Sequence, residues 1–399
     1  MTSKYMGLSK CRICGSFQLN KWLDLGSQPL ANNLLKNNNE SFDKYPLEVY
    51  KCEDCTLSQL SIVVDPNKMF NEYLWRSSTS QSWREHCKWI VGQLNPGYRR
   101  LVVDIGANDG CLLNYFKEKD FITLGIEPSQ QGTLGAENFY NYNSAHSLWN
   151  IEVAQQILID YDHADIITAT NVLAHVDNVH EFLEGVKLAL APDGIFYIEV
   201  PYLKDLLSHF RFDTIYHEHL SYFTVKALYK LMSYHNLKIT KIDWYPIHGG
   251  SLGVTVRHKQ HPCLVDKSVE TYLAMENNIN LDYNSFQNEI LLQKIYFLAA
   301  LRNLKGKTAI YGASAKATVF LNYMEITSGQ IWCAFDDNQD KWFKTIPGTG
   351  IQVFEFCPDD VDNLILTSWN VKGDLILRAR TAGFQGDFWC VINGKLQKI

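Results

Sequence analysis

Two cysteine pairs near the start of the chain constrain its folding more than any other feature. They are "CRIC" (Cys11, Cys14) and "CEDC" (Cys52, Cys55), each with C-x2-C spacing. This spacing lets two thiolates point at one ion from a tight turn, and two such turns complete a tetrahedral zinc site. All four ligands come from the protein, so no coordination position stays open for water. The sequence therefore predicts a structural Zn2+, with unrelated buried or redox thiols as the alternative.

The expected cellular setting bears on how the cysteines are interpreted. The N-terminus "MTSKYMGLSKCRIC" lacks the apolar segment of a signal peptide, and no apolar run is long enough to span a bilayer. We therefore expect a cytoplasmic protein with reduced thiols and no membrane partner. The remaining six cysteines are interpreted as small core hydrophobes: Cys87, Cys111, Cys263, Cys333, Cys357 and Cys390.

Length and charge limit the class of protein. A chain of 399 residues with 46% hydrophobic and 20% charged residues is typical of a globular protein of two or three domains. The net charge of −6 argues against nucleic acid as a partner, because nucleic-acid binders are usually basic. Small anionic substrates remain compatible with it, since they need only a local positive site.

A strand, a glycine-rich turn and a helix follow one another in "RLVVDIGANDGCLLNYFKEK" (Arg100–Lys119). Glycines in the turn "DIGANDG" let the backbone approach a ligand at the helix N-terminus. The turn is not the dinucleotide motif G-x-G-x-x-G, because Asn108 and Asp109 occupy its middle. The next strand ends in Glu127, which is placed to bind ribose hydroxyls. Together they indicate a nucleoside-type cofactor, with a generic α/β turn as the alternative.

This region resembles motif I and the following acidic position of S-adenosylmethionine (SAM) dependent methyltransferases. The alternation of strands and helices continues along the chain to an antiparallel pair at 237–247 and 251–258. This pattern predicts a doubly wound α/β sheet with its ligand beyond the carboxyl ends of the strands. Asp104, Gly106 and Gly110 would border the methionine part of SAM, and Glu127 its ribose. The full set of expected cofactor-binding residues is Asp104, Gly106, Asn108, Gly110, Glu127 and Asn171.

The stretch "DTIYHEHLSYFT" (Asp213–Thr224) holds two imidazoles, a carboxylate and two phenols. It follows a predicted strand, and Thr224 can cap the next helix, so we expect a loop on the cofactor side of the sheet. His175 follows another strand and converges on the same rim. Acid–base chemistry is favoured over metal binding, because adjacent residues do not easily face one ion and H-E-H is not H-E-x-x-H. A structural role for the histidines is the other alternative.

Three motifs in this order, "NVLAHVDN", "YHEHLSYF" and "HGGSLGV", lie behind the two cysteine pairs. They resemble the nucleotide-sugar C-methyltransferases, which include 3-C-methyltransferases of TDP-4-keto-deoxysugars. The resemblance implies a zinc-binding domain (1–75), a SAM-binding domain (76–258) and a C-terminal Rossmann-like α/β domain (259–399) around a central cleft. The active-site residues it implies are His175, Tyr216, Glu218 and His219, with substrate contacts from His217, Tyr222, His248 and Lys316.

The sequence departs from the family pattern at three positions. Trp75 stands where a second Tyr is usual, Gly253 where Arg is common, and Ala317 where Gly follows the lysine of the C-terminal motif. That motif opens a helix near Lys316 without G-x-G-x-x-G, so no dinucleotide is assigned to it. We expect an anion site there for a sugar-nucleotide diphosphate, with a solvated lysine as the alternative.

C-methylation of a sugar requires a carbon nucleophile, which a neighbouring ketone provides once its α-proton is removed. We expect His219 to be the base, a Tyr or second His to donate to the enolate oxygen, and Glu218 to orient an imidazole. Tyr216 as a phenolate is the competing base. The expected substrate is a TDP-linked 4-keto-deoxysugar, and the expected state a monomer or weak homo-oligomer. The rival functions are an O- or N-methyltransferase, including an RNA enzyme, and a catalytically inactive zinc-containing assembly protein.

Overall fold

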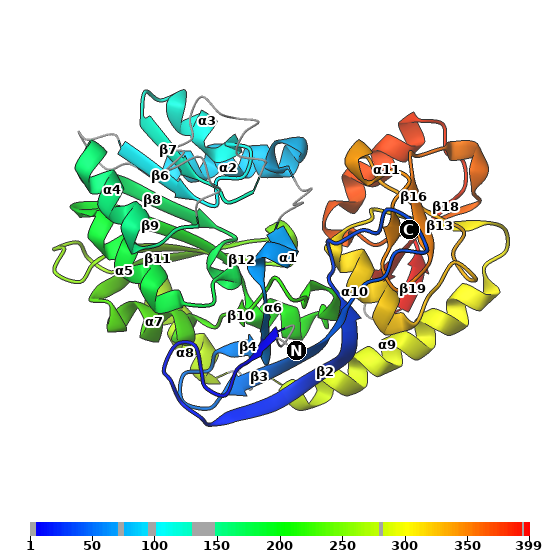
Figure 1. Cartoon of the computed structure of the whole chain (residues 1–399), viewed down its shortest axis with the longest axis horizontal. Helices are drawn as coiled ribbons and strands as arrows, with labels where there is room; N and C mark the ends of the chain where they lie inside the picture. The colour runs from blue at the N-terminus through cyan, green and yellow to red at the C-terminus, as the bar shows by residue number, and fades with distance from the viewer. Residues whose placement is uncertain (1–4, 71–75, 95–100, 130–147, 279–281, 393–394) are drawn as a thin grey trace.

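The computed structural model describes residues 5–70, 76–94, 101–129, 148–278, 282–392 and 395–399. Within these ranges the strands form sheets of two, four, six and seven strands. Figure 1 shows the six-stranded and seven-stranded sheets side by side, with the N-terminal strands β2 and β3 running beneath both. No helix in the described part of the chain is long and apolar enough to cross a membrane.

The N-terminal strands form a four-stranded antiparallel sheet of order β10-β4-β3-β2. One face is apolar: Leu23, Leu47 and Val49 are fully buried. Its fourth strand, β10, comes from the stretch 213–224, which the sequence predicted as a loop. The elements are β1 (Tyr5–Gly7), β2 (Leu19–Pro29), β3 (Lys44–Cys52), β4 (Ser58–Leu60), β5 (Ile62–Val64), α1 (Pro66–Phe70) and β10 (Ser221–Tyr222).

The central sheet has the order β11-β12-β9-β8-β6-β7. Strands β6 to β9 are parallel, and β12 and β11 close the sheet as the predicted antiparallel pair. The strands are β6 (Leu101–Ile105), β7 (Ile122–Ile126), β8 (Ala164–Thr170), β9 (Leu190–Pro201), β11 (Leu237–Tyr245) and β12 (Ser251–His258).

Helices cover both faces of the central sheet. Side chains alternate along a strand, so neighbours such as Val102 and Val103 enter different cores. One core contains α2 and α3, and the other α4, α5 and α7. The helices are α2 (Gln81–Gln93), α3 (Cys111–Lys117), α4 (Ile151–Tyr161), α5 (Val179–Ala189), α6 (Leu203–Ser208), α7 (Val225–Tyr234) and α8 (Lys267–Asn278).

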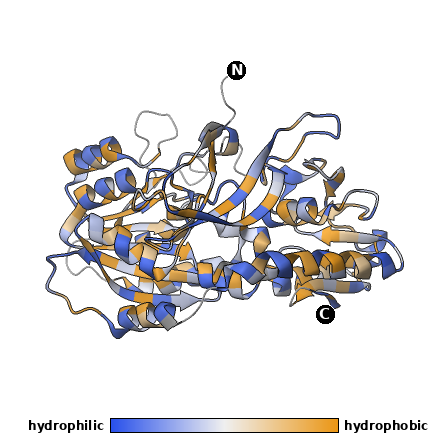
Figure 2. Cartoon of the chain, turned by 90° about the horizontal axis from the view of Figure 1, so that it is seen from below, coloured by the Kyte–Doolittle hydropathy of each residue, from blue (hydrophilic) through white to orange (hydrophobic). Residues whose placement is uncertain are grey.

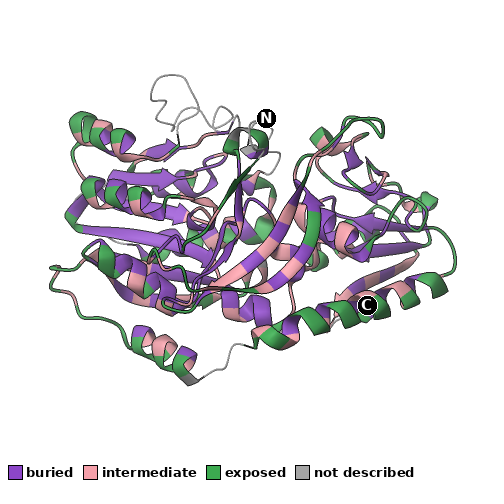
Figure 3. Ribbon diagram, turned by 60° about the horizontal axis from the view of Figure 1, so that its bottom comes forward, coloured by how far each residue is buried: buried purple, intermediate pink, exposed green. Residues whose placement is uncertain are grey.

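The C-terminal sheet has the order β15-β16-β14-β13-β17-β18-β19, with parallel inner strands. Figure 2 shows hydrophobic residues on both its strands and its helices, and Figure 3 shows the outward face of α9 exposed. The elements are α9 (Tyr283–Asn303), β13 (Thr308–Tyr311), α10 (Ala315–Met324), β14 (Ala334–Phe335), β15 (Thr345–Ile346), β16 (Ile351–Phe354), β17 (Asn363–Leu366), α11 (Lys372–Thr381), β18 (Asp387–Ile392) and β19 (Lys395–Lys398).

Side-chain caps fix where two helices near the cavity begin. The predicted cap of α7 is confirmed, because the Thr224 hydroxyl accepts a hydrogen bond from the backbone N–H of Ala227. Ser314 caps α10 in the same way, accepting from Ala317. The cap of α7 therefore fixes where this helix begins after the loop of His217 and His219. The cap of α10 does the same after the glycine turn that follows β13.

Candidate active site

A cavity of about 1100 Å³ lies where the three larger sheets meet. Its wall includes Asn32 of the N-terminal segment, the turn after β6, the histidine loops after β8 and β9, and the start of α10. All these segments follow strand ends, where an open α/β sheet binds ligands. The cavity is therefore the place to look for cofactor and substrate.

The glycine turn after β6 forms one wall. Gly106 has φ +71°, and a Cβ there would lie 2.4 Å from a methyl carbon of Val172, so no larger residue fits. The Glu127 carboxylate accepts backbone N–H bonds from Asn108 and Ser129, each 2.8 Å long. Glu127 thus lies across the mouth of the turn, as expected of an acid that binds ribose hydroxyls.

The other predicted cofactor residues divide into two groups. Asp104, Asn108 and Asn171 line the cavity, and burial raises the pKa of Asp104 to about 7 although Thr168 donates a 2.6 Å hydrogen bond to it. Gly110 is not among the described residues that line the cavity; it ends the turn, in the left-handed conformation, at the start of α3. The side chain of Asn108 accepts from the backbone N–H and the hydroxyl of Ser77, at 2.9 and 3.0 Å.

Tyr216 and His219 form a hydrogen-bonded pair on the opposite wall. The Tyr216 hydroxyl lies 2.9 Å from Nε2 of His219, and Nδ1 of the same ring lies 2.9 Å from the carbonyl oxygen of Thr214. A carbonyl oxygen only accepts, so Nδ1 carries the proton and Nε2 of the neutral ring has the lone pair. Nε2 is therefore the basic nitrogen, and it faces the phenol.

His175 completes this wall. Its ring centroid lies 4.8 Å from that of His219, with the rings nearly perpendicular. Burial lowers the pKa of His175 to about 4, although a hydrogen bond with the backbone of Glu218 raises it. His175 is thus a neutral imidazole at physiological pH. A hydrogen bond that raises the pKa of a histidine is one that its N–H donates, so the N–H of His175 goes to the Glu218 backbone and its other nitrogen can accept a hydrogen bond.

Glu218 lies behind the two histidines and is buried. Its carboxylate accepts hydrogen bonds of 2.8 and 2.9 Å from the Asn32 amide, and burial raises its pKa to about 7. It is not among the described residues lining the cavity, whereas Asn32 is. Glu218 therefore lies under the surface of the site, joined to the N-terminal segment.

The remaining predicted substrate residues do not all face the cavity. His217 is buried, lies 3.2 Å from the carbonyl oxygen of Pro46 and packs edge-on against Tyr45, which are the contacts of a structural histidine. Tyr222 is buried in β10, its ring centroid 6.4 Å from that of His219. The side chain of His248 and the whole of Trp75 lie outside the described residues.

Two cations converge on the cavity around Trp369. The Arg211 guanidinium lies 4.2 Å and the Lys316 ammonium 4.5 Å from the indole ring, whose N–H donates a 2.7 Å hydrogen bond to Asp213. Burial lowers the pKa of Lys316 to about 8, with Asp213 opposing this shift. Nη1 of Arg211 is buried and has no hydrogen-bond partner among the described residues. These two cations and the N-terminus of α10 suit an anion.

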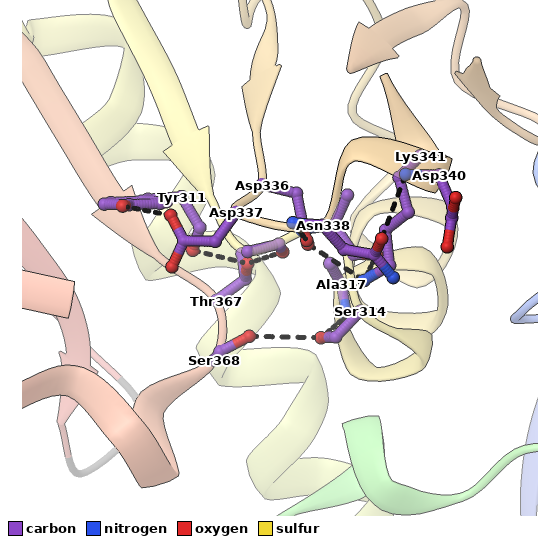
Figure 4. Close-up of polar contacts among 12 residues, drawn as sticks. Tyr311, Ser314, Ala317, Asp336, Asp337, Asn338, Asp340, Lys341, Thr367 and Ser368 are labelled. Carbon is purple, nitrogen blue, oxygen red and sulfur yellow. Dashed lines mark hydrogen bonds and ion pairs between the residues drawn. The ribbon is translucent and has the colours of Figure 1, made fainter. Parts of the chain in front are cut away.

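Two acids that follow β14 also line the cavity, and Figure 4 shows their polar contacts. Asp336 and Asp337 end β14, facing the glycine turn that leads into α10. Asp336 accepts from the backbone N–H of Ala313 at 2.8 Å and from Lys341 at 2.9 Å. Asp337 accepts from the Tyr311 hydroxyl at 2.7 Å. The glycine turn after β13 and the acids after β14 are arranged like the glycine turn after β6 and Glu127 after β7.

The four predicted zinc ligands lie together. Their sulfur atoms all lie within 4.8 Å of one another, with Cys11 and Cys55 3.4 Å apart and Cys14 and Cys52 3.5 Å apart. Four thiols at about the edge length of a ZnS4 tetrahedron fit a closed structural zinc site. Gly15 and Thr56, which follow the two pairs, both have positive φ, as two matching turns require.

The surroundings of Gly253, one of the departures from the family pattern, are visible in the structure. A Cβ at Gly253 would lie 2.4 Å from the Tyr197 hydroxyl oxygen, so tyrosines fill the space next to this position.

Sequence reasoning missed Asn32 and Arg211, because neither stands in a recognisable motif. A buried or cavity-facing position of a polar residue is the only signal for them, and it needs the fold.

Three family models match successive parts of the chain. "Putative zinc binding domain" matches residues 11–70, "Methyltransferase domain" residues 85–242 and "C-methyltransferase C-terminal domain" residues 246–392. The sheet with its glycine turn and terminal acid, beside a four-cysteine cluster, therefore defines a SAM-dependent methyltransferase with a structural zinc site.

More particularly, the chain is 30% identical over 390 residues to C-methyltransferase NovU of Streptomyces niveus, covering 92% of this chain and 91% of that one. The chain belongs to this C-methyltransferase family. It is also 28% identical over 115 residues to the ubiquinone biosynthesis O-methyltransferase of Glaesserella parasuis, covering 28% of this chain and 49% of that one. A solved complex of the Haloferax volcanii Trm112 activator and a methyltransferase aligns with a TM-score of 0.35 and 16% identity, over 44% of this chain and 90% of that one.

Proposed function

We propose that this C-methyltransferase acts on a nucleotide-linked 4-keto-deoxysugar, at C-3, through an enolate. One observation carries the proposal. A single cavity is bounded by the SAM turn, by the His219–Tyr216 pair with His175, and by the Arg211–Lys316 cluster. These three walls correspond to a methyl donor, an acid–base apparatus and an anion.

The acid–base residues account for the enolisation step. The Tyr216 hydroxyl turns from Nε2 of His219 to the ketone oxygen, which frees the lone pair of that nitrogen. Nε2 then takes the proton from the carbon next to the ketone, and the electron pair of that C–H bond moves toward the ketone oxygen. The Tyr216 hydroxyl donates a hydrogen bond to that oxygen as its charge grows, and the acceptor nitrogen of the neutral His175 binds a hydroxyl group of the sugar. When bound, SAM supplies an electrophilic methyl group whose transfer to the enolate carbon leaves a neutral thioether. His219 then releases its proton to solvent.

The positive cluster supports the nucleotide part of the substrate. A nucleotide sugar carries a diphosphate, and Arg211 offers a buried guanidinium group with an Nη1 that no described residue engages. Asp336 and Asp337 line the same cavity near the start of α10, where their carboxylates can accept hydrogen bonds from ribose hydroxyls. We propose TDP as the nucleotide.

The same reading divides the chain into zinc-binding (1–75), SAM-binding (76–258) and C-terminal (259–399) domains. Each larger sheet takes its strands from one of these ranges, apart from β10, which is contributed to the N-terminal sheet from residues 221–222. In this proposal β10 connects the zinc-binding domain directly to the loop of His219.

Mass spectrometry of a panel of nucleotide 4-keto sugars, incubated with enzyme and SAM, tests the proposal. The expected result is the gain of one methylene on one member, with the methyl carbon bonded to C-3. Methylation on oxygen, or no product from any nucleotide-linked keto sugar while another acceptor is methylated, would contradict it.

A further inference from the structure

Arg12 stands between two zinc ligands, yet its side chain leaves the zinc site and enters the protein. The side chain is only 2% exposed. It reaches the two loops that carry the histidines of the cavity, which are far apart in the sequence. No part of the proposed chemistry uses Arg12 directly, because it is not among the described residues lining the cavity.

The first loop is the one that carries His175. Nε of Arg12 donates a 3.1 Å hydrogen bond to Oδ1 of Asp177, and the two groups form an ion pair. Asp177 lies two residues after His175, lines the cavity, and has a side chain that is 39% exposed. A charge-assisted bond to a buried guanidinium therefore fixes this end of the loop.

The second loop is the one that carries His219. Nη1 of Arg12 donates to the carbonyl oxygen of Leu220, 3.1 Å away, and to that of Leu60, 3.3 Å away. Leu220 directly follows His219, and Leu60 ends β4. One guanidinium group therefore joins both histidine loops to the N-terminal sheet.

The backbone of Arg12 is held as firmly as its side chain. Its N–H donates a 2.9 Å hydrogen bond to the side chain of Gln59, which in turn donates to the carbonyl oxygen of Lys10 at 3.0 Å. Gln59 is fully buried in β4. With Cys11 and Cys14 as ligands of one ion, the position of Arg12 is set by the metal site.

We infer that Arg12 is a positioning residue, through which the zinc site fixes the distance between His175 and His219. The two rings, 4.8 Å apart, come from different loops, and the Arg12 guanidinium bonds to both loops within two residues of each histidine. The zinc site thus has a second task besides stabilising its own domain. This inference rests on the proposed roles of the two histidines.

The test uses Arg12→Met, Arg12→Lys and Asp177→Asn in the full-length, zinc-loaded protein. Arg12→Met should keep one zinc per chain and the affinity for SAM within twofold. It should lower kcat at least tenfold with an unchanged KM for the keto sugar, and Arg12→Lys should recover part of the loss. Because Asp177 is partly exposed, Asp177→Asn should fold normally and lower kcat by at least threefold.

A readout that needs no substrate separates this inference from the proposed function. In 15N-histidine NMR spectra, the ring signals of His175 and His219 should shift or broaden in Arg12→Met and Asp177→Asn, while those of the exposed His163 stay in place. If Arg12→Met loses its zinc, the inference is tested by the ring signals and kcat of Asp177→Asn instead. Unchanged ring signals and kcat in a folded, zinc-loaded variant would overturn the inference. Absence of turnover by the wild-type enzyme would count against the proposed function alone.

Discussion

The Tyr216 hydroxyl lies 2.9 Å from Nε2 of His219, and the other nitrogen of that ring lies the same distance from the carbonyl oxygen of Thr214. The carbonyl fixes the proton on Nδ1, so the phenol and the basic nitrogen share one hydrogen bond. A base held in this way has its lone pair directed along a known line before substrate arrives. In the proposed mechanism, the acid–base chemistry of the site depends on this pair.

The zinc site should be structural. Elemental analysis should find one zinc per chain, and Cys52→Ser should lose both the metal and the folded N-terminal sheet, because metal binding energy is also folding energy. The control is Cys357→Ser, since Cys357 is exposed and is not one of the four clustered cysteines. Zinc-free protein with a fully folded N-terminal sheet would contradict this prediction.

The ribose of SAM should depend on Glu127. Loss of charge-assisted hydrogen bonds in Glu127→Ala should weaken binding by about 1.5–3 kcal/mol, roughly a 10- to 150-fold rise in Kd by calorimetry. Glu127→Gln keeps an acceptor for the backbone N–H of Asn108, so it separates ribose binding from collapse of the turn. The exposed Glu118, at the end of α3, provides the control Glu118→Ala. Equal affinity in all four proteins would place the ribose elsewhere.

The stability of the protein should depend on pH through Glu218. Burial raises the pKa of this carboxyl to about 7, above its usual 4.5, so the folded state binds a proton that the unfolded state has released. Its ionisation therefore removes stability as pH rises from about 4.5 to about 7. Glu218→Gln lacks this ionising group. Its free energy of unfolding, relative to that of the wild type, should therefore increase as pH rises over that interval.

The gain should be on the order of 1–3 kcal/mol and should level off above pH 7. Urea unfolding of both proteins between pH 5 and 8 measures it. Taking the difference between variant and wild type cancels the opposite contribution of His175 and His217, whose lowered pKa values cost stability as pH falls toward 4. A difference that does not change with pH would show that Glu218 is ionised throughout.

The diphosphate of the substrate should depend on Arg211. Arg211→Gln removes a buried charge next to Lys316 and should raise the KM for the nucleotide sugar by about 10- to 100-fold, with a smaller effect on kcat. Arg302→Gln, on the exposed face of α9, is the matched control. An unchanged KM would remove the Trp369 cluster from the substrate site.

The sequence predicted the parts of this protein that motifs encode. Cys11 and Cys55 lie 3.4 Å apart as their pairs implied, and Glu127 lies across the turn that its position after β7 indicated. The family and its methyl donor also followed from motifs. Each of these features depends on local spacing or on the end of a strand, which sequence patterns report directly.

Contacts between distant segments were not predictable in the same way. Asn32 binds Glu218 across 186 residues of sequence, and Arg12 reaches Leu220 across 208. The stretch 213–224 contributes β10 to the N-terminal sheet because its partner β4 lies beside it only in the folded chain. His217 and His219 are two residues apart, yet His217 contacts Pro46 and His219 contacts Tyr216. The contact with Pro46 also exists only in the folded chain.

The central claim is that His219 removes the proton next to the ketone. Incubation of the substrate in D2O, with a SAM analogue that cannot donate its methyl group, isolates this step as exchange of the α-proton for deuterium. Wild type should exchange, and His219→Asn should keep SAM binding but lose exchange by about 100-fold or more. Wild-type exchange in His219→Asn, together with its loss in Tyr216→Phe, would contradict the account and make the phenol the base.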